Sequence, residues 1–220
     1  MNTKKLNSLP LREKKYAKTK IALLNALLDE LDKKALASIK IKELAFLAEV
    51  SEPTFFNYFE SKQHILVYFI QIWAVEMNGI ALQSEAKHNS YMEIVKDIFH
   101  QTAEQIAKHP QIMLEIIAFH AQKITLTPHT ITSAEKWLFF PTIDEVETLD
   151  GKGLESILPP LISKMIDAKE LPKTTDPQHL FLTLSSLFFG TALLVLKESP
   201  QAYPMLLDEQ INQLFKGLLC

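Results

Sequence analysis

The sequence contains little glycine and almost no cysteine. Only five glycines occur in 220 residues, and strand-like alternation of polar and apolar residues is rare. Because sheets need alternating strands joined by glycine-containing turns, both features favour an all-α fold. The single cysteine, Cys220, is the last residue and cannot form an internal disulfide, which suits a reducing compartment.

Segments that target a chain to a membrane are also missing from the sequence. No apolar run of signal-peptide type opens it, and no stretch supplies the roughly 20 apolar residues that cross a bilayer. The longest apolar stretch, 180–196, contains Thr183, Ser185, Ser186 and Thr191, so we expect a buried helix there. These observations predict a cytoplasmic protein with no membrane partner.

The familiar patterns of enzyme and metal sites do not occur either. There is no glycine-rich dinucleotide motif, no P-loop and no nucleophile elbow. The seven histidines form no i, i+4 pair, which argues against a structural zinc site. We expect no metal, no cofactor and no enzymatic activity. An all-α enzyme stays open as an alternative, in which two titratable groups such as His100 and His120 would meet in a pocket.

Charge is unevenly distributed along the chain. Residues 1–66 carry 12 Lys and Arg against 8 Asp and Glu, a net +4, whereas residues 67–220 carry 11 against 18, a net −7. Residues 1–20 hold seven basic side chains and only one acidic one, Glu13. A basic first part on an acidic body indicates contact with a polyanion, and a solvated basic tail is the alternative.

Apolar spacing predicts about nine helices. Apolar positions from Ala17 to Ala35 alternate at four and three residues, as on one face of a helix. A short pattern follows at 41–48, another opens at Ser51, and a long one runs from Ser61 to about residue 85. Residues 1–11 are expected to be unstructured. Prolines and glycines divide the rest into helices at about 90–108, 111–125, around Trp137, 154–170, 177–197 and 204–218.

Residues 51–62, SEPTFFNYFESK, concentrate four aromatic side chains in a short segment. At 100° per residue, Phe55 and Phe59 fall on one face of a helix and Phe56 and Asn57 on the opposite one. The spacing predicts that Phe55 and Phe59 are core, whereas Phe56 and Tyr58 need not be. Two short helices with a tight turn, an apolar back and a polar-aromatic front form a helix-turn-helix, whose second helix can enter the major groove of DNA.

The segment 40–66, KIKELAFLAEVSEPTFFNYFESKQHIL, resembles the DNA-binding signature of TetR-family transcription regulators. The matching positions are Leu44, Ala45, Ala48, Val50, Ser51, Thr54, Phe56, Tyr58, Phe59, Ser61 and Lys62. The resemblance implies a three-helix DNA-binding head at 1–62 and a ligand-binding and dimerisation body at 63–220. It also implies DNA contacts by Lys42, Pro53, Thr54, Phe56, Asn57, Tyr58 and Lys62. Of these, Asn57 can pair with adenine, Phe56 can touch a thymine methyl, and Lys62 would grip the DNA backbone.

Several residues depart from the family pattern. Glu49 stands where the turn often has glycine, and Lys40 replaces the usual threonine cap. Glu52 and Glu60 place negative charge beside the expected DNA surface, and Arg12 is the only arginine in the chain. With no arginine to read guanine, we expect recognition to rely on A·T contacts and DNA shape.

For the body, the resemblance implies a homodimer built from the last two helices and a pocket for a hydrophobic or amphipathic small molecule. The expected interface contains Ser186, Gly190, Leu207, Ile211 and Leu214. The expected pocket is lined by Phe69, Trp73, His100, Gln101, Met113, Ile117, His120 and Trp137. The sequence therefore predicts a cytoplasmic repressor released from a double-stranded DNA operator by its ligand. A DNA-binding protein without an inducer, acting through protein partners, stays open as an alternative.

Overall fold

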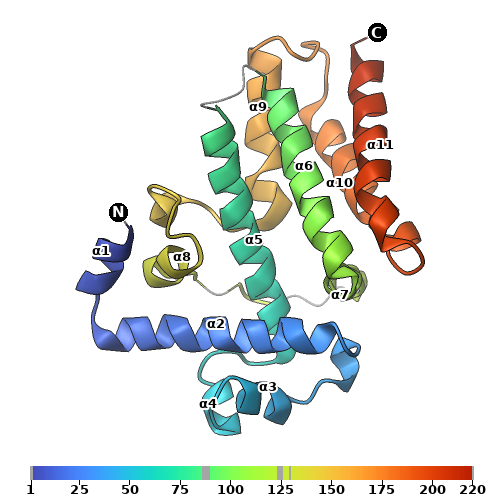
Figure 1. Cartoon of the computed structure of the whole chain (residues 1–220). Helices are drawn as coiled ribbons and strands as arrows, with labels where there is room; N and C mark the ends of the chain where they lie inside the picture. Colours follow the sequence, from blue (N-terminus) through green and yellow to red (C-terminus); the bar gives the residue numbers. More distant parts are fainter. Residues whose placement is uncertain (1, 86–89, 123–125, 129, 220) are drawn as a thin grey trace. The chain divides into compact units, whose positions relative to one another are not determined.

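The computed structural model describes residues 2–85, 90–122, 126–128 and 130–219. Within these ranges the chain forms eleven α-helices and four short 3₁₀ helices, and no strand (Figure 1). The all-α prediction is confirmed. The chain divides into two compact units, one made of Met1–Glu76 and Ala118–Gly151, the other of Met77–Ile117 and Lys152–Cys220. The functional division predicted from the sequence, 1–62 and 63–220, stays a prediction.

The first unit contains the helix-turn-helix. Its helices are α1 (Asn2–Ser8), α2 (Leu11–Leu31), α3 (Ile41–Leu47), α4 (Glu52–Phe55), the start of α5 (Lys62–Glu85) and α8 (Ser133–Phe139), with 3₁₀ turns at Leu36–Ser38 and Val146–Thr148. Of the apolar stripe predicted for α2, Ala17, Leu24 and Leu31 are buried, Ile21 and Leu28 are half-buried, and Ala35 is exposed beyond the end of the helix. Helix α3 packs against both α2 and α4 at one end of the unit (Figure 1).

One expectation for this unit was wrong. Residues 1–11 were expected to be unstructured, but Asn2–Ser8 forms helix α1, which packs against α8. The Lys5 ammonium forms an ion pair with Glu147 near the 3₁₀ turn that follows α8. A basic seven-residue segment has little helical propensity of its own, so tertiary contacts account for this helix.

The second unit is a bundle around α6 (Tyr91–Lys108). It also contains most of α7 (Pro110–Ala121), α9 (Leu158–Asp167), α10 (Pro177–Val195) and α11 (Tyr203–Leu218), with 3₁₀ turns at Gly153–Ser156 and Pro200–Ala202. Helix α11 packs against α6 and α10, and α9 packs against the same two helices. The N-terminus of α6 is capped by the Glu170 carboxylate, which accepts from the backbone N–H groups of Tyr91 and Met92 at 2.8 Å.

Helix α10 is apolar on all sides but buries only one of them in its own unit. Leu184, Phe188 and Ala192 lie in the core, whereas Leu193 and Leu194 are 56% and 80% exposed. The prediction of a helix buried all round is therefore not met within the single chain. By length and composition, α10 and α5 could each cross a membrane, but core helices of soluble proteins pass the same test.

Candidate DNA-binding surface and ligand site

The turn between α3 and α4 has the geometry that a helix-turn-helix requires. The Val50 N–H donates to the Ala45 carbonyl at 2.9 Å, which closes the end of α3. Just before it, Glu49 adopts a left-handed backbone with a φ of 56°. The glycine usual in this turn is absent, and the non-glycine residue takes up the left-handed conformation with strain on the order of 1 kcal/mol.

The recognition segment begins with a capped helical turn. The Ser51 hydroxyl accepts from the Thr54 N–H at 3.2 Å and lies 2.7 Å from the Thr54 hydroxyl. Pro53 stands in the first turn, where its missing N–H leaves no bond unmade. Helix α4 ends at Phe55 and residues 56–58 form a tight turn, so residues 51–62 do not form the continuous helix on which the sequence analysis placed them.

The aromatic side chains of this segment divide as predicted. Phe55 and Phe59 are fully buried, whereas Phe56 is 51% exposed and Asn57 is also exposed. Tyr58 is half-buried, and its ring centroid lies 4.9 Å from that of Tyr16 on α2. The buried pair anchors the segment to the core, which leaves Phe56 and Asn57 directed away from it.

The two lysines expected at the DNA backbone have different surroundings. Lys42 is exposed on α3. The Lys62 ammonium instead donates to the carbonyl oxygens of Ala37 at 3.1 Å and Ile39 at 2.7 Å, and also to that of Leu36. These carbonyls terminate the 3₁₀ turn between α2 and α3. Because its three N–H groups are engaged there, Lys62 holds this connection together in the structure.

A buried ion pair beneath this surface was missed by the sequence reasoning. Lys20 of α2 and Glu135 of α8 are 1% and 0% exposed, and Lys20 Nζ lies 2.7 Å from Glu135 Oε1. Burial lowers the pKa of Lys20, although Glu135 acts in the opposite direction. Burial alone would raise the pKa of Glu135, but the Lys20 ammonium and the hydrogen bonds from Thr132 outweigh it and hold that pKa below its usual value.

The residues expected to line a ligand pocket are divided between the two units. Phe69, Trp73, His120 and Trp137 belong to the first unit, and His100, Gln101, Met113 and Ile117 to the second. Trp137 donates its indole N–H to Glu147 at 2.9 Å, and Lys5 and Trp137 together lower the pKa of Glu147 to about 2. His100, Gln101 and His120 are exposed, Met113 is buried, and the other four are half-buried.

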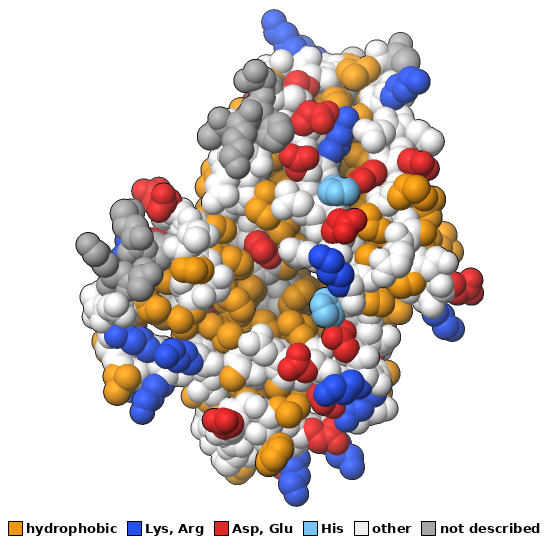
Figure 2. Space-filling model, in the orientation of Figure 1, with side chains coloured by type: hydrophobic (Ala, Val, Ile, Leu, Met, Phe, Trp, Pro, Cys, Tyr) orange, Lys and Arg blue, Asp and Glu red, His pale blue; other side chains and the backbone are white. Residues whose placement is uncertain are grey.

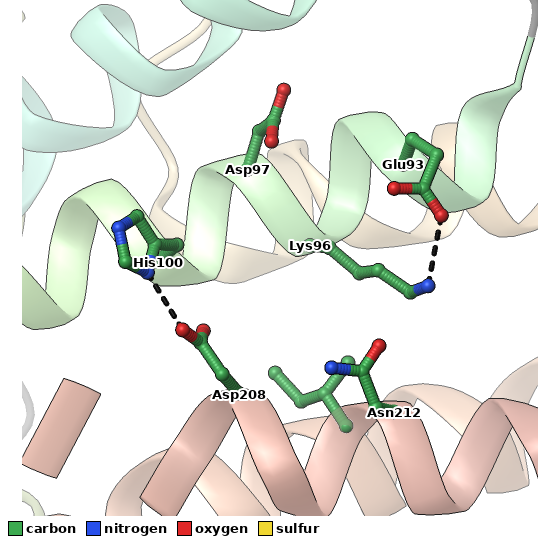
Figure 3. A pocket seen from close by; sticks show the side chains of 7 residues that line it. Glu93, Lys96, Asp97, His100, Asp208 and Asn212 are labelled. Carbon is green, nitrogen blue, oxygen red and sulfur yellow. Dashed lines mark hydrogen bonds and ion pairs between the residues drawn. The ribbon is translucent and has the colours of Figure 1, made fainter. Parts of the chain in front are cut away.

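The second unit has a shallow groove of about 230 Å³ between α6 and α11 (Figure 3). His100 Nδ1 lies 2.7 Å from Asp208 Oδ2 across it, and Lys96 forms an ion pair with Glu93 at 2.8 Å. Figure 2 shows side chains of both charges and histidine gathered on this face. Of the residues expected to line a ligand pocket, the groove contains only His100, so the apolar pocket stays a prediction. The described residues include no group of three or more His, Cys, Asp or Glu arranged to hold a metal ion.

The expected dimer residues also differ in their surroundings. Ser186 is exposed, and a Cβ added to Gly190 would meet nothing within 4 Å. Leu214 is half-buried. Leu207 and Ile211, however, are 0% and 1% exposed, because the apolar stripe of α11 packs on its own unit. Those two side chains face the core of the chain that carries them.

The fold of this chain is similar to that of several solved proteins. No protein-family model matches the sequence, and no curated protein does. Among solved structures, Thermus thermophilus FadR, a TetR-family transcriptional repressor in complex with lauroyl-CoA, matches with a TM-score of 0.59 and 18% identity over 89% of this chain and 92% of its own. A TetR regulator from Rhodococcus sp. RHA1 matches at 0.58 and 19%, over 92% and 96%. The fatty acid degradation regulator FadR from Bacillus halodurans matches at 0.56 and 14%, over 91% and 97%.

Likeness at these identities is a likeness of fold. The chain therefore has the all-α fold of TetR-family transcription regulators over about nine-tenths of its length. The resemblance predicted from residues 40–66 is confirmed at that level. None of these three structures is described as an enzyme.

Proposed function

We propose that this protein is a cytoplasmic, TetR-like transcription regulator that binds double-stranded DNA through α3, α4 and the turn 56–58. The observation that carries the proposal is the division of the recognition segment. Phe55 and Phe59 fix it to a buried core, while Phe56 and Asn57 stand out in solvent. An exposed phenylalanine beside an exposed amide suits a surface that meets base edges, because the ring can pack on a thymine methyl and the amide can pair with adenine.

Each exposed group has a matching base contact. The Asn57 amide can donate to adenine N7 and accept from its N6 amino group, and the Phe56 ring can pack on a thymine methyl. Pro53, Thr54 and Tyr58 border the same surface, and Lys42 adds positive charge from α3. Since Lys62 is engaged with backbone carbonyls, the proposed phosphate contacts omit it. The contact set therefore favours A·T-containing half-sites.

The second unit supports a homodimer. The exposed face of α10 presents Leu182, Leu193 and Leu194, with Ser186 and Gly190 on the same helix allowing close backbone approach. A helix face that exposes three leucines is expected to be covered by a second copy. Leu207 and Ile211 are left out of the proposed interface because they lie in the core. Two copies would present two recognition segments to a palindromic operator.

The proposed ligand is an amphipathic molecule with a long apolar chain. The neighbour from T. thermophilus was solved with lauroyl-CoA, and the sequence of this body is rich in apolar and aromatic residues. We propose that such a ligand favours a conformation with lower DNA affinity, so that the protein acts as a repressor. A regulator without an inducer is the alternative.

The test is a binding-site selection from random duplex DNA, followed by gel-shift titration of the selected site with and without lauroyl-CoA. We expect an A·T-containing palindrome. We expect Asn57→Ala to relax discrimination at one position per half-site by about 1–3 kcal/mol, roughly 5- to 150-fold. Asn212→Ala, which removes an exposed amide from α11, is the matched control and should change nothing. Absence of any selected sequence would refute the proposal, and release that does not respond to lauroyl-CoA would favour the inducer-free alternative or another ligand class.

A further inference from the structure

An unbroken series of aromatic rings runs from the recognition segment to α8 within the first unit. The exposed ring of Phe56 contacts Phe55 edge-on at 5.4 Å between centroids, and Phe55 lies 6.3 Å from Phe59. Phe59 lies 5.5 Å from Tyr68 on α5, and Tyr68 lies 6.4 Å from Phe139 at the end of α8. Each step falls within the range over which aromatic rings pack favourably.

The ammonium of Lys20 occupies the centre of this series. It lies 4.1 Å from the ring centroid of Tyr68, 5.6 Å from that of Phe59 and 5.9 Å from that of Tyr16. Tyr16 in turn contacts Tyr58 of the recognition segment. A desolvated cation inside about 6 Å of three rings is attracted to all of them, so its position fixes theirs. Lys20 therefore contacts Tyr68, which packs on Phe59, and Tyr16, which packs on Tyr58.

The counter-ion of Lys20 comes from α8. Glu135 is the third residue of that helix, and its Oε2 accepts from the Thr132 N–H at 2.9 Å and the Thr132 hydroxyl at 2.6 Å. These bonds fix the carboxylate to the N-terminus of α8 in a capping box. Because neither charge is exposed to water, α8 cannot move away from Lys20 without leaving a buried charge uncompensated.

We propose that Glu135 and Lys20 are positioning residues that couple α8 to the recognition segment. Held by α8, the carboxylate fixes Lys20, and Lys20 fixes the rings beneath Phe59 and Tyr58. Displacement of α8 would then loosen residues 56–59 on the far side of α2. This assignment rests on the proposed function for its regulatory meaning: Trp137, two residues beyond Glu135, is one of the residues that the sequence predicts to contact the ligand, so a ligand that displaces α8 would reach the DNA surface by this route.

The test is amide hydrogen exchange of the free, full-length protein, which needs neither DNA nor ligand. The reporters are the amides of Asn57, Tyr58 and Phe59, which donate to Thr54 and Phe55 carbonyls at 2.9–3.0 Å. The main variant is K20M/E135Q, which removes both charges, keeps the side-chain volumes and leaves an amide oxygen for the Thr132 cap. A second variant, Tyr16→Leu, removes the ring that links Lys20 to Tyr58 and leaves the Lys20–Glu135 ion pair intact. The control is K96M/E93Q, which neutralises a solvent-exposed pair on α6.

We expect K20M/E135Q to speed exchange about tenfold at 57–59 and at 132–139, with α10 unchanged. Tyr16→Leu should speed exchange at 57–59 only, and the control should leave all these segments as they are. A purely structural pair would instead alter exchange throughout the unit or only next to α8, and unchanged exchange at 57–59 in a folded K20M/E135Q protein would overturn the assignment. If the wild-type protein selects no DNA, the proposed function fails, but the exchange result still decides the coupling.

Discussion

Replacing Lys20 with methionine leaves Glu135 buried without its cation, which makes it a severe perturbation for a single substitution. Methionine is one heavy atom shorter than lysine but similar in volume, and its thioether suits the aromatic surroundings. The loss is therefore mainly electrostatic. Removing one partner of a buried ion pair destabilises a protein by about 3–5 kcal/mol. For a chain of this size, roughly 2–4 °C per kcal/mol predicts a fall in Tm of roughly 6–20 °C.

The effect of Lys20→Met should depend on pH in a defined direction. In the wild type the folded pKa of Glu135 is depressed, so its contribution to stability is complete above the unfolded pKa and is lost as pH falls. In the variant, burial is opposed only by the remaining hydrogen bonds, so the folded pKa of Glu135 rises. The destabilisation should then be largest near pH 8 and should shrink as pH falls toward the unfolded value of about 4.5.

The assay is urea unfolding of wild type, Lys20→Met and K20M/E135Q between pH 5 and 8, followed by circular dichroism. The double variant should recover at least half of the lost free energy of unfolding and should remove the extra pH dependence. Lys33→Met is the control, because its side chain is 63% exposed beside Glu30 and a surface ion pair contributes little to stability. A Lys20→Met penalty equal to that of the control, or one that grows toward pH 5, would refute the reasoning.

Two further predictions concern the helix-turn-helix. Glu49→Gly should relieve the left-handed backbone strain at φ 56° and raise the free energy of unfolding by about 1 kcal/mol. Glu52→Gly replaces a residue inside helix α4 and should lower the free energy of unfolding instead. Urea unfolding measures both variants. Lys62→Met should leave the carbonyls of Ala37 and Ile39 without their charged donor and lower Tm. The salt dependence of DNA binding should stay that of the wild type. A salt slope reduced by about one unit would instead show that Lys62 contacts a DNA phosphate.

The sequence was informative wherever structure depends on near neighbours along the chain. The i, i+4 spacing of Phe55 and Phe59 was enough to predict which aromatic side chains are buried, and the Ser51 cap and the α2 stripe were equally local. The dimer prediction shows where this reasoning stops. The apolar stripe through Leu207 and Ile211 identifies the buried face of α11, but the same stripe results whether the helix packs on its own chain or on a partner.

The Lys20–Glu135 pair was missed because its partners are separated by 115 positions, although each half left a signal. Lys20 falls in the middle of the apolar stripe that includes Ala17, Leu24 and Leu31, where a charge needs a partner. Glu135 follows Thr132 by three residues, the spacing of a capping box. The capping box uses only one oxygen of the Glu135 carboxylate and leaves the other available to a cation. A lysine on a buried stripe, in turn, needs an anion that its own helix does not supply. A charge inside an apolar stripe therefore predicts a distant contact, but only the tertiary structure identifies α8 as its source.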